Sequence, residues 1–108
     1  MNKRKGEIDM NIQALMKQAQ TLQKDMQKQE EEIEKTEFEG ESALVKVKVN
    51  GRKEVLSVTI QNKESLEKED LEILEDMIMV AFNNAFKKVD DLREQKMSKY
   101  SNMMPGLF

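Results

Sequence analysis

The spacing of apolar residues changes its period twice along the chain, and no other feature limits the fold as strongly. Over residues 12–33 apolar side chains recur on alternating steps of three and four, which is typical of a helix with a narrow heptad seam. Over residues 45–60 they recur at every second position, which is typical of half-buried strands. Over residues 71–92 helical spacing returns with a wider apolar face, suited to covering a sheet.

The alternating segment predicts more than one strand. Asn50-Gly51 lies between two alternating runs and is a strong hairpin signal, because both residues tolerate the positive φ that tight hairpin turns require. A shorter strand around Phe38 is expected before them, turning at Gly40–Ser42. The sequence therefore predicts an α+β fold of the order α-β-β-β-α, with a three-stranded antiparallel meander flanked by two long helices.

The length and composition favour one domain with a small core. The chain has 108 residues, of which 38% are hydrophobic and 36% charged. We expect a single domain over residues 12–100 and a flexible basic segment over residues 1–11. Pro105-Gly106 would break a helix, so residues 101–108 are expected to form a flexible tail.

Several functional classes are disfavoured by the residues that the chain lacks. It has no Cys and no His, which removes thiol nucleophiles, Cys/His zinc sites and the usual general base at neutral pH. Its carboxylate clusters are more simply solvated helix faces, so we expect no enzyme, no metal, no cofactor and no small-molecule substrate. No apolar run approaches the ~20 residues of a membrane span, and a soluble, non-exported protein without a membrane partner is expected.

The first helix is long for what it can bury. A helix of about 25 residues spans ~38 Å, whereas a compact domain of this size has a radius of gyration near ~13 Å. Its seam would suit one neighbouring helix, either the second helix folded back or a helix of another copy. Together with the small core, this length predicts a homodimer with protruding helical arms. The seam residues are Ile12, Leu15, Ala19, Leu22 and Met26.

Basic residues gather on the side of the first helix that faces away from this seam. The net charge is −3, but Lys17 and Lys24 share one outward heptad position, while Lys28 and Lys35 share the adjacent one. The far half of the second helix contributes further cations. The residues alone leave two interpretations open, namely simple solvation of exposed helix faces and binding of phosphates.

Several segments together resemble the YbaB/EbfC family of bacterial nucleoid-associated proteins. They are LMKQAQTLQKDMQKQEEEI, GESALVKVKVNGRKEVLSVTI, DLEILEDMIMVAFNNAFKKVDDLREQKM and the terminal MPGLF. The resemblance implies an α-β-β-β-α homodimer with tweezer-like helical arms, and DNA binding of low or variable sequence specificity in the nucleoid. The chain departs from the family in lacking extra glycines after Ser42, which predicts a tighter first turn.

With this resemblance, phosphate contact becomes the favoured interpretation. Lysine is a mobile point charge, and no helix offers a convincing set of residues for reading base edges. The expected partners are DNA and a second copy of the chain, in the cytoplasm and nucleoid. The candidate DNA contacts are Lys17, Lys24, Lys28, Lys87, Lys88, Arg93 and Lys96.

Two alternatives stay open. One places the DNA contacts elsewhere, on the strand residues Lys46 and Lys48 or on the basic residues 3–5. The other is a different function, that of a prefoldin-like protein-binding adaptor or holdase. Such a protein would use the apolar seam and the nine methionines on client chains.

Overall fold

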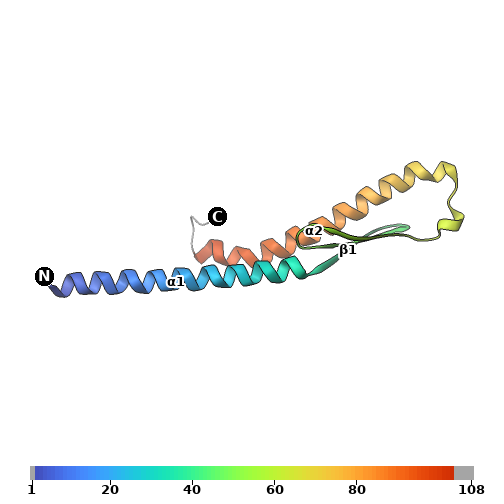
Figure 1. The fold of residues 1–108 in the computed structure, drawn as a ribbon. Helices are drawn as coiled ribbons and strands as arrows, with labels where there is room; N and C mark the ends of the chain where they lie inside the picture. The colour runs from blue at the N-terminus through green and yellow to red at the C-terminus, as the bar shows by residue number, and fades with distance from the viewer. Residues whose placement is uncertain (1, 104–108) are drawn as a thin grey trace.

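The computed structural model describes the backbone of residues 2–103 and the side chains of residues 11–101, and it confirms the predicted α-β-β-β-α order (Figure 1). The strands form an antiparallel meander in the order β1-β2-β3. The elements are α1 (Asn2–Lys35), β1 (Glu37–Ser42), β2 (Val45–Asn50), β3 (Val55–Ile60), the short 3-10 turns η1 (Lys63–Ser65) and η2 (Lys68–Asp70), and α2 (Leu71–Met103).

The two helices extend beyond the ranges expected for them. The helix α1 begins at Asn2, ten residues before the first member of the apolar seam. The helix α2 continues to Met103. The rest of the expected C-terminal tail, residues 104–108, lies outside the described residues.

The first turn lies further along the chain than expected. The strand β1 continues through Ser42, which pairs with Val45, and the two-residue turn is formed by Ala43 and Leu44. Ala43 has a φ of 47°, the left-handed conformation that a short turn requires. The prediction of a turn at Gly40–Ser42 was therefore wrong, although the turn is as tight as expected.

Gly40 is a point of close packing. A Cβ atom at this position would lie 2.0 Å from the carbonyl oxygen of Ala81 and 2.7 Å from the amide nitrogen of Ala85. The glycine and the two alanines therefore allow α2 to approach β1 backbone to backbone. Gly40, which was predicted to belong to a turn, is therefore the residue that permits this close contact.

The second turn is where Asn50-Gly51 predicts it, but the two residues have other roles than positive φ. The side-chain oxygen of Asn50 accepts hydrogen bonds from the amides of Arg52 and Glu54, at 2.9 and 3.0 Å. Lys53 adopts the left-handed conformation, with a φ of 61°. A Cβ on Gly51 would lie 1.9 Å from the carbonyl oxygen of Ile33, so this glycine lets the hairpin pack against the end of α1.

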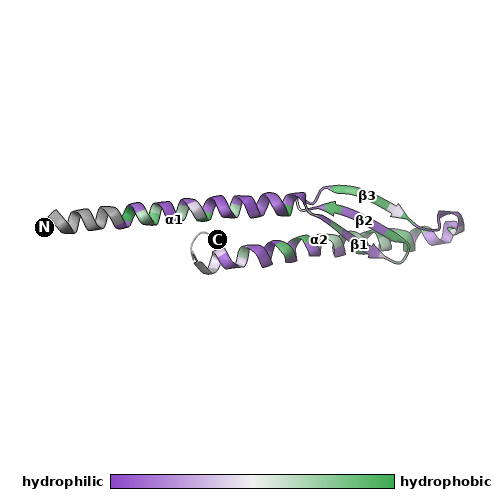
Figure 2. Ribbon diagram, turned by 90° about the horizontal axis from the view of Figure 1, so that it is seen from below, coloured by the Kyte–Doolittle hydropathy of each residue, from purple (hydrophilic) through white to green (hydrophobic). Residues whose placement is uncertain are grey.

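The core lies between α2 and one face of the sheet. Val45, Val47 and Val49 are 0–1% exposed, as their alternation with lysines predicts. They pack with Phe38 and with a row on α2 that consists of Ala81, Ala85 and Val89. This helix lies on β1 and β2, and Figure 2 shows β3, largely hydrophobic, at the edge of the sheet away from it.

Past the sheet, α1 and α2 pack side by side as an antiparallel pair, which we call the stem (residues 19–33 and 89–100) (Figure 1). Ile33 is fully buried and Tyr100 is 2% exposed. Ile12 and Leu15 are 49% and 63% exposed, because α1 continues alone beyond the end of α2. The molecule is consequently elongated, with extents of 84 × 19 × 13 Å.

Candidate nucleic-acid interface

The outward face of α1 carries a row of exposed lysines that we call the lysine stripe (Lys17, Lys24, Lys28 and Lys35). At about 100° per residue, these four positions fall within roughly 40° of one another around the helix axis. They lie opposite the partly buried Leu22 and Met26, which face α2. Packing in the stem therefore fixes which side of α1 is left to solvent, and that side is basic.

The first two members of the stripe have few acidic neighbours. Between residues 11 and 28 the sole acidic residue is Asp25. Its carboxylate accepts a hydrogen bond of 2.7 Å from the Tyr100 hydroxyl, on the side of α1 that faces α2. Glu31 and Glu32 follow Lys28 by three and four residues and precede Lys35 by four and three, so they lie beside both of these lysines. The most positive part of the face is thus the segment from Lys17 to Lys24, and Lys28 lies at its edge.

The ammonium groups of Lys17, Lys24 and Lys28 are available to a ligand. Within the part of the chain that the structure describes, none of them forms an ion pair or a side-chain hydrogen bond with another residue. Exposed glutamines at positions 13, 20 and 27 lie beside them and can donate further hydrogen bonds.

Arg93, one of the cations expected to contact DNA, joins three parts of the protein in the structure. Its guanidinium donates to both carboxylate oxygens of Glu30, at 2.7 and 3.3 Å, and to the carbonyl oxygen of Gly51 at 3.0 Å. The hydrogen bonds with Glu30 raise the pKa of Arg93 above its ordinary value. This side chain fastens α2 to α1 and to the β2–β3 hairpin.

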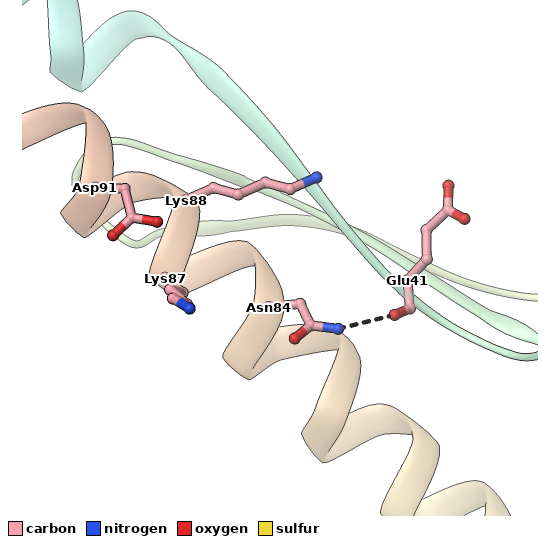
Figure 3. Close-up of a pocket in the computed structure, with 5 residues that line it drawn as sticks. All are labelled: Glu41, Asn84, Lys87, Lys88 and Asp91. Carbon is pink, nitrogen blue, oxygen red and sulfur yellow. Dashed lines mark hydrogen bonds between the residues drawn. The ribbon is translucent and has the colours of Figure 1, made fainter.

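Two further cations of α2 are also engaged within the protein. The Lys88 ammonium donates to the carbonyl oxygen of Glu39 at 2.7 Å, and Lys96 donates to the side chain of Gln29 at 3.4 Å. Figure 3 shows Lys88 extending toward β1, beside Asn84, whose amide donates to the carbonyl oxygen of Glu41 at 3.1 Å. The contacts of Lys88 and Asn84 lie along the outer edge of β1, whereas that of Lys96 joins α2 to α1.

Lys87 lies on the outer surface of α2 among acidic residues. It lines a shallow, open pocket with Glu41, Asn84, Lys88 and Asp91 (Figure 3). Asp90, Asp91 and Glu94 follow it within two turns of the helix. The sequence thus placed seven cations in one candidate site, whereas the structure separates a basic face on α1 from an outer face of α2 that is mixed in charge.

The open face of the sheet, an alternative site, is also balanced in charge. Lys46 pairs with Glu41 and Lys48 pairs with Glu37 across neighbouring strands, each at 3.6 Å. The side chains of the other alternative, residues 3–5, lie outside the described residues.

Tyr100 is a stem residue that the sequence did not single out. Its hydroxyl donates to Asp25, and this hydrogen bond is the main reason that its pKa is raised from 10.0 to about 12. The tyrosine and Arg93 hold the two helices at different levels of the stem. Within one chain, α2 closes the apolar seam from Leu22 to Ile33, whereas Ile12 and Leu15 of the same seam stay exposed.

The described residues also lack the features of two other classes of site. No group of three or more His, Cys, Asp or Glu is arranged there to hold a metal ion. No helix in this part of the chain combines the length and the apolarity needed to cross a bilayer.

Comparison with known proteins points to one family. A model of the YbaB/EbfC DNA-binding family matches residues 8–104. A nucleoid-associated protein of Ligilactobacillus salivarius is 39% identical over 100 residues, covering 91% of this chain and 95% of its own. Another, from Streptococcus sanguinis, is 43% identical over 98 residues, covering 89% and 98%. These comparisons favour DNA binding over the protein-binding alternative.

The fold also has a counterpart among solved structures. The uncharacterized protein HP0035 from Helicobacter pylori superposes with a TM-score of 0.66, over 80% of this chain and 91% of its own. The sequence identity of this pair is 24%, so the similarity concerns the fold.

Proposed function

Because the chain belongs to the YbaB/EbfC DNA-binding family, a family of DNA-binding proteins and not of enzymes, we propose that it binds duplex DNA mainly through backbone phosphates and with little sequence specificity. Its place of action would be the nucleoid in the cytoplasm, as the names of its relatives indicate. Binding there would change the conformation of DNA, organise the nucleoid or affect gene expression.

The observation that carries this proposal is the lysine stripe on α1, whose members form no ion pair with the side chains of residues 11–101. From Lys17 to Lys28 the helix rises about 16 Å, and over such a length B-DNA presents roughly ten phosphates. Three mobile ammonium groups can each reach a phosphate without one fixed register. Weak sequence specificity follows from this freedom.

The chemistry of the same face argues against direct reading of bases. Arginine, whose planar fork suits bidentate contact with guanine, is absent from residues 11–35, and the lysines of this face are mobile point charges. Lysine and glutamine suit phosphate oxygens equally well at any sequence. We therefore assign the primary contacts to Lys17, Lys24 and Lys28, with Lys87 as a secondary contact.

A homodimer belongs to the same proposal. Two copies would duplicate the lysine stripe and allow one particle to hold two segments of DNA. The single chain supports this arrangement because its buried core contains few residues and its stem is long.

The test is a charge reversal within the stripe, Lys24→Glu with Lys28→Glu, measured by fluorescence anisotropy on a labelled duplex. We expect affinity to fall at least about tenfold at low salt, and the slope of log K against log salt to lose about 0.9 for each phosphate contact removed. The matched control is Lys63→Glu with Lys68→Glu, which changes the same charge at the opposite end of the molecule. Equal losses in the two double variants would overturn the assignment of the stripe.

A further inference from the structure

The apolar seam of α1 extends beyond the helix that covers it. Ile33 is fully buried, and Met26 and Leu22 are half-buried where α2 lies beside them. Ile12 and Leu15, the two members nearest the N-terminus, are 49% and 63% exposed. The burial of one continuous seam therefore decreases toward the region where α1 continues past the end of α2 (Figure 1).

The exposed members lie on the same side of α1 as the buried ones. At about 100° per residue, Leu15 falls within roughly 20° of both Leu22 and Ile33 around the helix axis. Met16, next to Leu15, is 58% exposed. We call Ile12, Leu15 and Met16 the open seam. Because it continues the line along which α2 packs, a segment that follows α2 in the chain would lie directly over it.

The end of α2 lies close to the open seam. The Tyr100 hydroxyl donates to Asp25 at 2.7 Å, so these two residues mark the same level of the stem. The helix α2 ends three residues later, at Met103, after a further rise of about 4.5 Å toward the N-terminus of α1. From that level, Leu15 lies about 10 Å further along α1 and Ile12 about 15 Å.

The sequence that follows α2 has the length and the composition to cover this distance. Residues 104–108 read MPGLF, which contains Met, Leu and Phe and no charged residue. A helix of five residues would advance about 7.5 Å and stop short of Leu15, whereas five extended residues span up to about 17 Å. Pro105 and Gly106 oppose a helix and favour the longer, extended path. The final Leu and Phe would then reach the open seam.

We propose that residues 104–108 of the same chain cross the end of the stem and pack on the open seam. The apolar seam of α1 would then be covered along its whole length, by α2 over its C-terminal half and by residues 104–108 over its N-terminal half. The lysine stripe lies on the opposite side of α1 and stays exposed. This inference goes beyond the proposed function, since it concerns the order of α1 and does not depend on DNA.

Such a cover would stabilise the part of α1 that has no helix beside it. Residues 11–18, which we call the arm, are all exposed in the structure. Most helical stability in proteins comes from packing of an apolar face, and a short helix without such packing is marginal in water. Packing of residues 104–108 would therefore hold the arm in helical form, together with Lys17, the first member of the lysine stripe.

The first test places a single tryptophan at the end of the chain, by the substitution Phe108→Trp, because the natural sequence has none. We expect its emission to lie at shorter wavelength, and its quenching by acrylamide to be severalfold slower, than for N-acetyltryptophanamide in the same buffer. Leu15→Asp in this background puts a charge in the open seam and should remove both effects. The matched control is Gln13→Asp, which makes the same charge change on the opposite side of α1 and should leave both effects in place.

The second test measures the arm itself by amide hydrogen exchange and mass spectrometry. Leu107→Ser with Phe108→Ser removes two apolar side chains without adding charge. We expect exchange of residues 11–18 to become severalfold faster in this variant, and exchange of residues 78–90, which pack on the sheet, to stay the same. Far-ultraviolet circular dichroism checks that each variant keeps the fold.

Two results of the tryptophan experiment would overturn the proposal, namely a tryptophan as exposed as the free reference and an emission that Leu15→Asp leaves unchanged. Equal exchange of residues 11–18 in the serine variant and the unaltered protein would also overturn it, since any cover of the open seam would then come from elsewhere, such as a second copy. These measurements contain no DNA. Their failure is therefore distinct from a failure of DNA binding, which the stripe variant tests by anisotropy.

Discussion

At the scale of single residues, Tyr100 gives the stem a contact with a clear spectroscopic signature. It is the only tyrosine, and the chain has no tryptophan, so absorbance near 295 nm reports its ionisation alone. The phenol must be protonated to donate to Asp25, and this hydrogen bond is the main cause of a pKa of about 12 instead of 10.0.

The direction of the resulting pH dependence follows from the raised pKa. The neutral phenol is favoured in the folded state, so the contribution to stability is complete below pH 10 and is lost as the pH rises through about 12. We expect the native protein to form tyrosinate with a midpoint near 12, and Asp25→Ala to move this midpoint toward 10.0. A midpoint that Asp25→Ala leaves unchanged would show that the hydrogen bond is absent in solution.

Some residue roles could be predicted from the sequence and others could not. The alternation of Val45, Val47 and Val49 with lysines identified the buried face because the period of a strand is a local property. The partners of Arg93 and Tyr100 lie 63 and 75 residues away in the chain. The residues next to Arg93 in the sequence do not distinguish a cation that binds DNA from one that joins two helices, and those next to Tyr100 do not indicate its partner.

At the scale of elements, Arg93 connects α1, α2 and the β2–β3 hairpin through Glu30 and the carbonyl of Gly51. Its side chain is 33% exposed, so the contact is partly screened by solvent. We expect Arg93→Ala to lower the free energy of unfolding by about 1–2 kcal/mol in urea denaturation, since a forked, charge-assisted hydrogen bond is lost.

Arg52→Ala is the matched control for this prediction. Arg52 pairs with Glu54 at 3.7 Å, with both side chains more than 60% exposed, and its removal should cost less than about 0.5 kcal/mol. Folded Arg93→Ala should retain nearly full affinity for DNA. A stability equal to that of Arg52→Ala, with a marked loss of DNA binding, would instead identify Arg93 as a DNA contact.

The helices and strands could be predicted from the sequence, whereas the choice of strands that α2 covers could not. Helical and strand periods are visible in the sequence and gave the correct order of helices and strands. A helix about 10 Å wide covers roughly two strands spaced about 4.8 Å apart, so one of three must lie at the margin. The close contact of Gly40 with Ala81 and Ala85 places α2 over β1. The strand β3 is therefore not covered by this helix.

At the scale of the whole molecule, the long first helix carries two different faces, an apolar seam and the lysine stripe. Its narrow seam is closed by α2 from Leu22 to Ile33, and this contact turns the lysine stripe outward. The sequence correctly predicted that the seam needs one neighbouring helix and that the lysines face away from it. It left open whether that neighbour belongs to the same chain, because both arrangements use one heptad pattern.

The separation of acidic from basic surfaces explains how a protein of a DNA-binding family can have a net charge of −3. Acidic residues gather near the end of α1, on β1 and around the start of α2, away from Lys17 and Lys24. Local charge, and not the sum over the chain, decides where a polyanion can approach.

The most direct test of the central claim is lysine footprinting, in which acetylation of each lysine is measured by mass spectrometry with and without duplex DNA. The stripe hypothesis predicts that DNA lowers the reactivity of Lys17, Lys24 and Lys28 severalfold, on duplexes of unrelated sequence, and leaves Lys63 and Lys68 unchanged. Protection of Lys46 and Lys48 with an unprotected stripe would contradict it.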